Sequence, residues 1–363
     1  MKKYLIVGLI VLVGGFILLK PLFDNDGPVI PPKKVSPALF SFEENLATIR
    51  NQPIEITIKI NENIQKLEVV FNDSIIKSWN HPMDSLLNFI FNPSIFGVGT
   101  KSFDLLSTLE DGSTFIDNRL VRVLSEIIPE KLTLVELNSY PHQSTSFTQG
   151  LEFYKGNLYE GTGDPGNQGK TIVAKVDLST GGHLEKMGLD AGYFGEGITI
   201  LNDTLYQITW QNQKCYTYDV TNKLQLIGEY NYVGEGWGLC NDGSSLIMSD
   251  GSERIVFREP NGFRTQKTIE VYNNEGPIIN LNELEYIDGK IYANVWMTNI
   301  IVVIDPNTGQ VLQEIDATDF VIKNRGSGEA LNGIAKNPIN SKTYLTGKYW
   351  NKMYEVKFVE PVL

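Results

Sequence analysis

Hydrophobic and polar residues alternate over much of this chain, in runs of five to ten residues. Residues 54–60 read Ile-Glu-Ile-Thr-Ile-Lys-Ile, and residues 132–140 alternate in a similar way. Alternation with a period of two places one face of a strand in a core and the other face in water. Turn residues such as Asn72-Asp73 and Asp111-Gly112 separate the runs. The pattern predicts an all-β protein made of short strands.

One hairpin pattern occurs five times in the second part of the chain. Its first copy is Gly150-Leu151-Glu152-Phe153, a turn at Lys155-Gly156, and Leu158-Tyr159. The other copies contain Gly195-Glu196-Gly197, Gly238-Leu239, Glu283-Leu284 and Gly333-Ile334. A period of about 41 to 50 residues is typical of propeller blades with four strands each. The last copy supplies three strands, so we expect residues 132–140 to complete its sheet and close the ring. Residues 132–363 are therefore predicted to form a five-bladed β-propeller.

The first part of the chain has a different pattern. Residues 41–128 contain about seven short strands, which is typical of an immunoglobulin-like β-sandwich, although the cysteine pair of antibody domains is missing. We interpret this sandwich as a spacer or docking module, and an unknown binding partner remains an alternative.

The N-terminal residues 1–22 combine Met-Lys-Lys with an apolar run at 4–19. This composition is typical of an export signal or a membrane anchor. Bulky residues where a cleavage site would lie favour an uncleaved anchor, with the body of the protein on the outer side. Residues 23–40 carry several prolines and are expected to form an extended linker. We therefore expect a periplasmic or extracytoplasmic protein.

Composition excludes several functions. The net charge is -12 and there is no basic patch, so nucleic-acid binding is not expected. The three histidines, His81, His142 and His183, have no zinc-ligand spacing, which excludes a zinc-type cyclase and leaves a serine nucleophile without a partner. A calcium ion bound by backbone carbonyls in the channel remains open. Cys215 and Cys240 either pair across adjacent blades or remain two buried thiols.

Glu196 is the main candidate for chemistry. It lies between Gly195 and Gly197, with Phe194 before it and Trp210 after the next strand. We expect the glycines to let the backbone bend sharply through positive φ angles and expose the carboxyl group to a ligand. A carboxyl group among aromatic rings loses water, which raises its pKa toward the range useful for proton transfer.

Equivalent positions of a propeller become neighbours, because the loops that enter the innermost strands gather at one end of the channel. This rule brings together residues of the inner strands and of the loops before them, namely Phe147, Gln149, Phe194, Glu196, Trp237, Asn282, Glu283 and Asn332. The ends of the second strands add Trp210, Trp296 and Lys348, and Asp250 is a weaker candidate. The result is a carboxylate, several amides and an ammonium group inside a box of three tryptophans and two phenylalanines.

These positions lie in motifs that resemble a known family. The motifs include Phe147-Thr148-Gln149-Gly150-Leu151, Phe194-Gly195-Glu196-Gly197, Glu235-Gly236-Trp237-Gly238-Leu239, Leu281-Asn282-Glu283-Leu284-Glu285, Leu331-Asn332-Gly333-Ile334-Ala335 and Thr346-Gly347-Lys348. At these spacings, residues 132–363 resemble the glutamine cyclotransferases of the plant and bacterial type.

The resemblance implies that an N-terminal glutaminyl residue of a peptide or protein is converted to pyroglutamyl with release of ammonia. It assigns proton transfer to Glu196 and polar substrate contacts to Gln149, Asn282 and Lys348. It assigns the pocket walls to Phe147, Phe194, Trp210, Trp237 and Trp296. The chemistry itself suggests that Lys348 or Asn282 stabilises the oxyanion. We expect a monomer that needs no cofactor.

Two other functions are compatible with the residues. A propeller that only docks peptides would keep the aromatic box but would not need the Glu196 carboxyl group. A lactonase-type or lyase-type propeller would need metal carboxylates at several repeat positions, and Glu196, Glu283 and Asp250 are the available ones.

Overall fold

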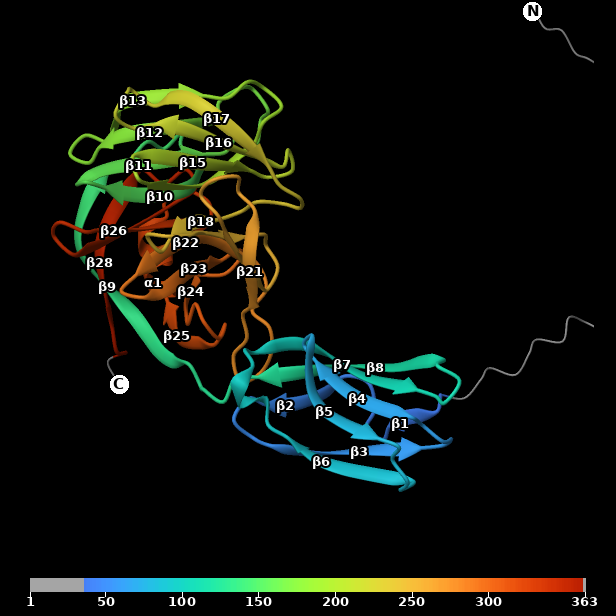
Figure 1. Ribbon diagram of the computed structural model, residues 1–363. Coiled ribbons are helices and arrows are strands. Elements are labelled where there is room, and N and C mark those ends of the chain that lie inside the picture. The colour runs from blue at the N-terminus through green and yellow to red at the C-terminus, as the bar shows by residue number, and fades with distance from the viewer. Residues whose placement is uncertain (1–35, 362–363) are drawn as a thin grey trace, which may run out of the picture. The chain divides into compact units, whose positions relative to one another are not determined.

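The computed structural model describes residues 36–361, and strands dominate this part of the chain (Figure 1). The all-β prediction is confirmed. The described residues also contain one α-helix, α1 (Thr318–Asn324), which the sequence pattern did not indicate. The predicted signal or anchor segment, residues 1–22, lies outside the described residues, as does most of the predicted linker. No helix among residues 36–361 is long and apolar enough to cross a membrane.

Two sheets form the first part of the described chain. The three-stranded sheet has the order β1-β3-β6, with β1 (Ala38–Phe40), β3 (Ile54–Ile60) and β6 (Leu86–Phe91). The five-stranded sheet has the order β2-β8-β7-β4-β5, with β2 (Leu46–Ile49), β8 (Thr114–Leu124), β7 (Gly99–Thr108), β4 (Lys66–Phe71) and β5 (Ser74–Asn80). A short 3-10 turn, η1 (Pro93–Ile95), follows β6.

Both sheets contribute to one apolar core. Strand β4 buries Leu67, Val69 and Phe71 at alternate positions, and β3 contributes Ile56 and Ile58 from the other sheet. The strand predicted over residues 54–60 is confirmed, whereas β1 begins before the predicted start of this part at residue 41. The immunoglobulin-like assignment stays a prediction.

The second part contains five groups of four strands. The first three are separate sheets, β10 (Thr148–Tyr154) to β13 (Gly182–Gly188), β14 (Gly195–Leu201) to β17 (Gln225–Asn231), and β18 (Leu239–Asn241) to β21 (Thr265–Glu270). Their middle strands are β11 (Asn157–Thr162), β12 (Ile172–Asp177), β15 (Thr204–Thr209), β16 (Lys214–Asp219), β19 (Leu246–Ser249) and β20 (Arg254–Arg258).

The last two groups share an eight-stranded sheet. The fourth group comprises β22 (Leu281–Ile287), β23 (Lys290–Val295), β24 (Ile300–Ile304) and β25 (Val311–Asp316). The fifth comprises β26 (Leu331–Asn337), β27 (Lys342–Gly347), β28 (Lys352–Val359) and β9 (Glu130–Pro141).

The first strands of these five groups form a closed ring. Strand β10 contacts β14, β14 contacts β18, β18 contacts β22, β22 contacts β26, and β26 contacts β10. Figure 1 shows several of these inner strands near the middle of this part of the chain. The propeller-like arrangement expected from the repeats is therefore confirmed, with five groups of four strands in a closed ring.

Strand β9 closes the ring. It pairs antiparallel with β28, with Ser139 opposite Tyr354, as predicted for residues 132–140. Its first residues also pair in parallel with β25, with Lys131 opposite Glu314, and these two side chains form an ion pair. This second pairing was not predicted. Because β9 contacts two blades, no edge of either sheet is left open at that position.

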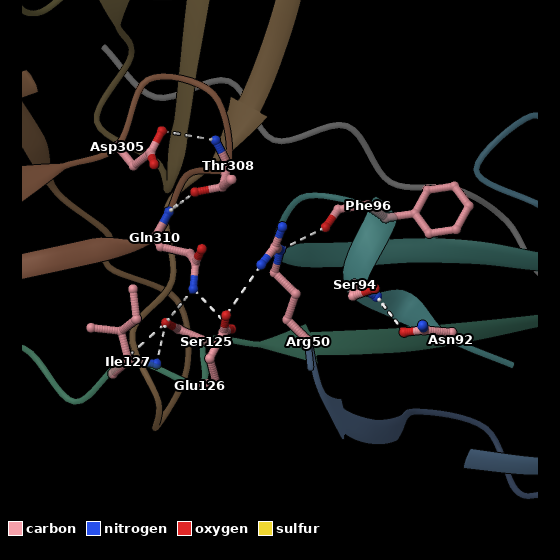
Figure 2. A network of polar contacts seen from close by, with 10 residues as sticks. All are labelled: Arg50, Asn92, Ser94, Phe96, Ser125, Glu126, Ile127, Asp305, Thr308 and Gln310. Atoms are coloured by element: carbon pink, nitrogen blue, oxygen red, sulfur yellow. Dashed lines mark hydrogen bonds and ion pairs between the residues drawn. The ribbon is translucent and has the colours of Figure 1, made fainter. Parts of the chain in front are cut away.

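Polar contacts also join the two parts of the chain at the predicted boundary (Figure 2). The Gln310 side chain donates to Ser125 Oγ at 3.0 Å and to Glu126 Oε2 at 2.9 Å. Arg50 donates to the other oxygen of Glu126 at 3.1 Å and to the Phe96 carbonyl at 2.9 Å. Residues 37–361 accordingly belong to one compact unit.

Cys215 and Cys240 are both free and buried. They lie in different clusters of the propeller core, around β16 and around β18, and each replaces an ordinary apolar side chain there. The second of the two possibilities left open by the sequence is therefore correct.

The closure strand yields a stability prediction. The half-buried Leu134 packs against the apolar core of the last two blades, whereas its neighbour Val135 is exposed. Replacing Leu134 by Ala should lower the free energy of unfolding by about 1 to 2 kcal/mol, because apolar contacts are lost at the seam. Val135→Ala should change it by less than about 0.5 kcal/mol. Denaturant unfolding measures both, and equal effects would contradict the role given to Leu134.

Candidate active site

One cavity of about 360 Å³ is lined by nine of the residues that the sequence predicted for the site. The nine are Phe147, Gln149, Phe194, Glu196, Trp210, Trp237, Asn282, Trp296 and Lys348. Three further lining residues were missed, namely Met297, Glu329 and Ala330. All five blades contribute to this lining, so the cavity depends on the closed ring.

Bulges in the inner strands aim the polar side chains of the cavity. The pairing of β10 with β11 skips Gln149, and the pairing of β14 with β15 skips Glu196 and Gly197. The pairing of β22 with β23 likewise skips Asn282 and Glu283. A bulge locally re-aims the side chain that has no partner on the neighbouring strand. The same local irregularity in the first, second and fourth blades therefore places Gln149, Glu196 and Asn282 around one space.

The glycines beside Glu196 serve a different purpose from the one predicted. Neither Gly195 nor Gly197 has a positive φ angle. A Cβ atom at Gly197 would collide with the backbone of Gly238 and Leu239 in the next blade, and one at Gly195 would come within 2.6 Å of the Gln207 amide. These glycines allow close approach of neighbouring strands, which holds the Glu196 backbone firmly in the ring.

The ends of the second strands supply Trp210, Trp296 and Lys348. Each backbone amide donates to the opposite loop of its own hairpin: Trp210 to Phe194 at 2.9 Å, Trp296 to Asn280 at 2.8 Å and Lys348 to Ala330 at 3.0 Å. The residues that follow two of them, Met297 and Tyr349, have positive φ angles of 68° and 61°. Such backbone conformations are uncommon for residues with a side chain, and they turn the chain away directly after the pocket residue.

The aromatic side chains form two walls. In one wall, Phe194 contacts Phe147 and Trp210 in edge-to-face pairs, with ring centroids 5.9 Å and 5.7 Å apart. In the other wall, Trp237 and Trp296 make a T-shaped pair at 5.4 Å. Edge-to-face pairs contribute about 0.5 to 1.5 kcal/mol each beyond their buried area, so both walls are well ordered. Trp210 and Trp296 remain 38% and 37% exposed, which leaves the cavity open to a ligand.

The Glu196 carboxyl group lies in an apolar environment and is 5% exposed. Burial raises the pKa of Glu196 well above its usual value; the positive charge of Lys348 opposes this rise, and the negative charge of Glu235 adds to it. Among the described residues, no group donates a hydrogen bond to this carboxyl group. Glu196 is therefore poised to exchange a proton with a bound molecule.

Lys348 is equally buried and shows the complementary effect. Burial lowers the pKa of Lys348, against the opposing influence of Glu196 and Glu329. Its Nζ atom lies 4.6 Å from the centroid of the Phe147 ring, in a cation–π contact. Glu196 and Lys348 are thus an acid and an amine in the same cavity, and the loss of water weakens the charged forms of both.

Glu235 was missed as a site residue, although it lies in one of the motifs. Its Oε2 atom accepts from the indole nitrogen of Trp210 at 2.8 Å and from that of Trp237 at 3.0 Å, while Gln211 donates to Oε1 at 3.0 Å. Burial acts to raise the pKa of Glu235, but these hydrogen bonds outweigh it and lower the pKa. Glu235 thereby links the two aromatic walls through one carboxylate.

The side-chain amides of Gln149 and Asn282 differ in their hydrogen bonding. The Gln149 carbonyl accepts a hydrogen bond from Asn332 at 3.2 Å, and Asn332 also donates to the Thr148 carbonyl at 2.9 Å. In contrast, the buried Oδ1 atom of Asn282 has no hydrogen-bond partner among the described residues. An unpaired buried amide is costly, and because Asn282 lines the cavity its Oδ1 atom is free to accept a hydrogen bond from a ligand.

Three other predicted residues do not line the cavity. Glu283 faces the neighbouring blade and accepts from the Ile334 backbone at 2.9 Å, and Asn332 supports Gln149 from behind. Asp250 pairs with Arg254 at 2.9 Å. Among residues 36–361, no three His, Cys, Asp or Glu side chains are grouped so that they could hold a metal ion. His142 and His183 both approach Glu160 of β11.

Comparisons with known proteins agree with this site. The sequence profile of the family described as glutamine cyclotransferase matches residues 118–358, which include all nine predicted cavity residues. A glutaminyl-peptide cyclotransferase of Arabidopsis thaliana is 39% identical over 227 residues, which cover 60% of this chain and 69% of the plant protein. The crystal structure of Myxococcus xanthus glutaminyl cyclase matches with a TM-score of 0.59 and 32% identity, over 64% of this chain and 98% of that protein.

The ring of five four-stranded groups and its buried acid define a propeller-like enzyme scaffold, and the chain belongs to the glutamine cyclotransferase family. It is a homologue of glutaminyl-peptide cyclotransferase, an enzyme. The family resemblance read from the motifs is confirmed.

The packing of the first aromatic wall yields a prediction. A Cβ atom at Gly163 would overlap the Phe194 ring and come within 3.1 Å of Phe147. Gly163→Ala should therefore displace Phe194, lower the free energy of unfolding by about 1 to 3 kcal/mol and change the near-UV circular dichroism of the Phe194–Trp210 pair. Gly276→Ala is the matched control, because a Cβ atom there meets open space. A spectrum unchanged by Gly163→Ala would refute the packing argument.

Proposed function

We propose that this chain converts N-terminal glutaminyl residues of peptides or proteins to pyroglutamyl residues, with release of ammonia and without a metal. The observation that carries the proposal is the buried Glu196 carboxyl group, which faces an aromatic cavity together with Lys348 and receives no hydrogen bond from the described residues. The names of the plant and bacterial relatives support the same reaction.

Glu196 serves as the proton shuttle. The neutral α-amine of the substrate attacks the carbon of its own side-chain amide, and a new C–N bond closes a five-membered ring. Glu196 takes a proton from the attacking nitrogen and then gives it to the departing NH2 group, so that ammonia leaves and Glu196 is regenerated. A shuttle of this kind contributes about 10² to 10⁴ in rate. The raised pKa of Glu196 suits it for both halves of the transfer.

Lys348 and Asn282 stabilise the negative charge that develops on the amide oxygen. Both side chains line the cavity. Each donor to such an oxyanion lowers the barrier by roughly 3 kcal/mol in other acyl transfers. The free Oδ1 atom of Asn282 also offers an acceptor for the substrate amine. Gln149 completes the polar contacts from the neighbouring blade.

The aromatic walls supply proximity. A glutaminyl side chain is flexible, and cyclisation requires the amine to lie next to the amide carbon. Two rigid walls, formed by Phe147, Phe194 and Trp210 on one side and by Trp237 and Trp296 on the other, leave a cavity of about 360 Å³, at the small end of the range of ligand sites. The cavity thereby favours the folded side chain and excludes water.

The other parts of the chain have proposed roles that rest on the sequence. We propose that residues 4–19 anchor an exported, monomeric protein to the membrane. Residues 41–128 act as an immunoglobulin-like spacer or docking module for the propeller of residues 132–363. The natural substrates would then be exported peptides or proteins that begin with glutamine.

The two competing functions predict different results when ammonia release is measured with and without a chelator. A peptide-docking propeller would release no ammonia. A metal-dependent lactonase or lyase would lose its activity in the presence of a chelator. The proposed cyclotransferase releases ammonia from a glutaminyl dipeptide with or without the chelator.

Glu196→Gln tests the shuttle. Because the amide can neither accept nor donate the transferred proton as a carboxyl group does, kcat for ammonia release should fall by about 10² to 10⁴. Glu285→Gln is the matched control, since Glu285 is an equally buried carboxyl group on β22 that does not line the cavity. If both variants retain wild-type kcat, Glu196 is not the shuttle.

The pH profile tests the charge balance. Glu196 must be ionised to accept a proton, so kcat should rise as the pH passes upward through its raised pKa. It should fall again where Lys348, whose pKa is lowered, loses its proton. Lys348→Met removes the positive charge that opposes the rise in the pKa of Glu196, and the acid limb should therefore move to higher pH. The same dipeptide is used for both proteins, so that titration of its amine is common to both profiles. A shift to lower pH would contradict this assignment.

A further inference from the structure

A buried pair of ionisable side chains lies directly behind the cavity and has no part in the mechanism above. The Glu160 carboxylate on β11 is 1% exposed, and His142, in the segment between β9 and β10, is 7% exposed. His142 Nε2 lies 2.9 Å from Glu160 Oε1. Burial acts to lower the pKa of His142, but the charge and hydrogen bond of Glu160 outweigh it and raise the pKa. The two side chains thus form a buried ion pair.

Glu160 holds the segment that carries two cavity residues. It accepts from the Thr148 hydroxyl at 2.7 Å and from the Ser146 hydroxyl at 3.2 Å. Phe147 and Gln149 alternate with these two residues along the chain, so their backbone is fixed from the opposite side. Glu160 therefore orients the first aromatic wall and the Gln149 amide without touching the cavity.

His142 holds the turn that carries Lys348. Its Nδ1 atom lies 2.7 Å from the Trp350 carbonyl, and its backbone amide donates to the Asn351 carbonyl at 3.0 Å. The Tyr349 amide, directly after Lys348, donates to the Ser146 carbonyl at 2.8 Å. The pair consequently joins two stretches more than 200 positions apart, at the place where the first and last blades meet.

We propose that the His142–Glu160 pair is a positioning device for the active site, which fixes the segment 142–149 against the turn 348–351 and thereby places Lys348 relative to Phe147 and Gln149. The proposal rests on the proposed function for its effect on catalysis. Both side chains are positioning residues, because neither lines the cavity. One other imidazole faces the pair, since His183 Nε2 lies 3.9 Å from the second oxygen of Glu160.

The geometry explains why a charged pair is retained in this place. Glu160 accepts from His142, Ser146 and Thr148 of the segment 142–149, and a neutral apolar side chain would leave the hydroxyl groups of Ser146 and Thr148 without an acceptor. Breaking a buried pair by removing one partner is strongly unfavourable, so the two segments are held in one arrangement. The cation–π contact of Lys348 with Phe147 is the element of the cavity that depends on both segments.

The test measures the position of Lys348 directly. In the full-length protein, lysines are reductively methylated with ¹³C, and the Lys348 resonance is identified by its loss in Lys348→Met. In His142→Gln and Glu160→Gln, this resonance should shift. The pKa of the Lys348 amine, followed through the resonance, should rise toward its ordinary value, because the amine moves out of its buried position. Asp117→Asn is the control: it breaks the pair between the buried Asp117 and the partly exposed Arg119, at 3.0 Å, in the first part of the chain. It should destabilise the protein and leave the Lys348 resonance in place.

A double-mutant cycle tests the effect on catalysis. His142→Gln should lower kcat for ammonia release by about 10-fold to 100-fold, the loss expected for a displacement near 1 Å. In the Lys348→Met background, His142→Gln should cause no further loss, whereas a purely structural role would give additive losses. An unchanged Lys348 resonance or additive losses would overturn the proposal. If the resonance moves but the wild-type protein releases no ammonia, the proposed function fails and the positioning role stands.

Discussion

The closure of the ring by β9 is the constraint on which the other features depend. The cavity receives side chains from all five blades, and the last blade is complete only when β9 adds to β28. Closure brings the first and last blades into contact through β10 and β26. Without it, Lys348 on the fifth blade and Gln149 on the first would have no fixed distance. A pairing between strands far apart in sequence thus decides the geometry of a site that neither strand touches.

The closed scaffold makes an isolated acid tolerable. A buried carboxyl group without hydrogen bonds is unfavourable. The close approach of Gly195 and Gly197 to neighbouring strands holds Glu196 in place, because no group among residues 36–361 donates a hydrogen bond to its carboxyl group. The two charged side chains near Glu196, Glu235 and Lys348, differ in how many hydrogen bonds they can still form. Glu235 is saturated by two indoles and one amide, whereas Lys348 contacts a ring face and retains donors for a ligand. Glu196 and Lys348 are therefore an acid and a cation in the same cavity that are free to act on a bound molecule.

Much of the site could be predicted from the sequence because the repeats carry it. Glu196, Asn282 and Gln149 occupy corresponding places in their hairpins, and a closed ring turns such correspondence into proximity. The packing role of Gly195 and Gly197 could not be predicted from the repeats, since a Cβ atom at Gly197 would clash with Leu239 of another blade. Glu329 and Met297 lie in connections outside the repeated pattern. Glu235 stands in a motif, but its two indole partners come from different hairpins. The parallel pairing of β9 with β25 also leaves no local signal.

The recurring bulges have a consequence for how such a scaffold changes over time. At each bulge, one side chain points toward the cavity, and the strand pairing continues on both sides of it. These side chains are an amide in β10, a carboxyl group in β14 and an amide in β22. Replacing one of these side chains changes the reactivity of the cavity without changing the strands that carry it. A new reaction can therefore arise in this fold by a single substitution at a bulge position, while the surrounding strands keep their arrangement.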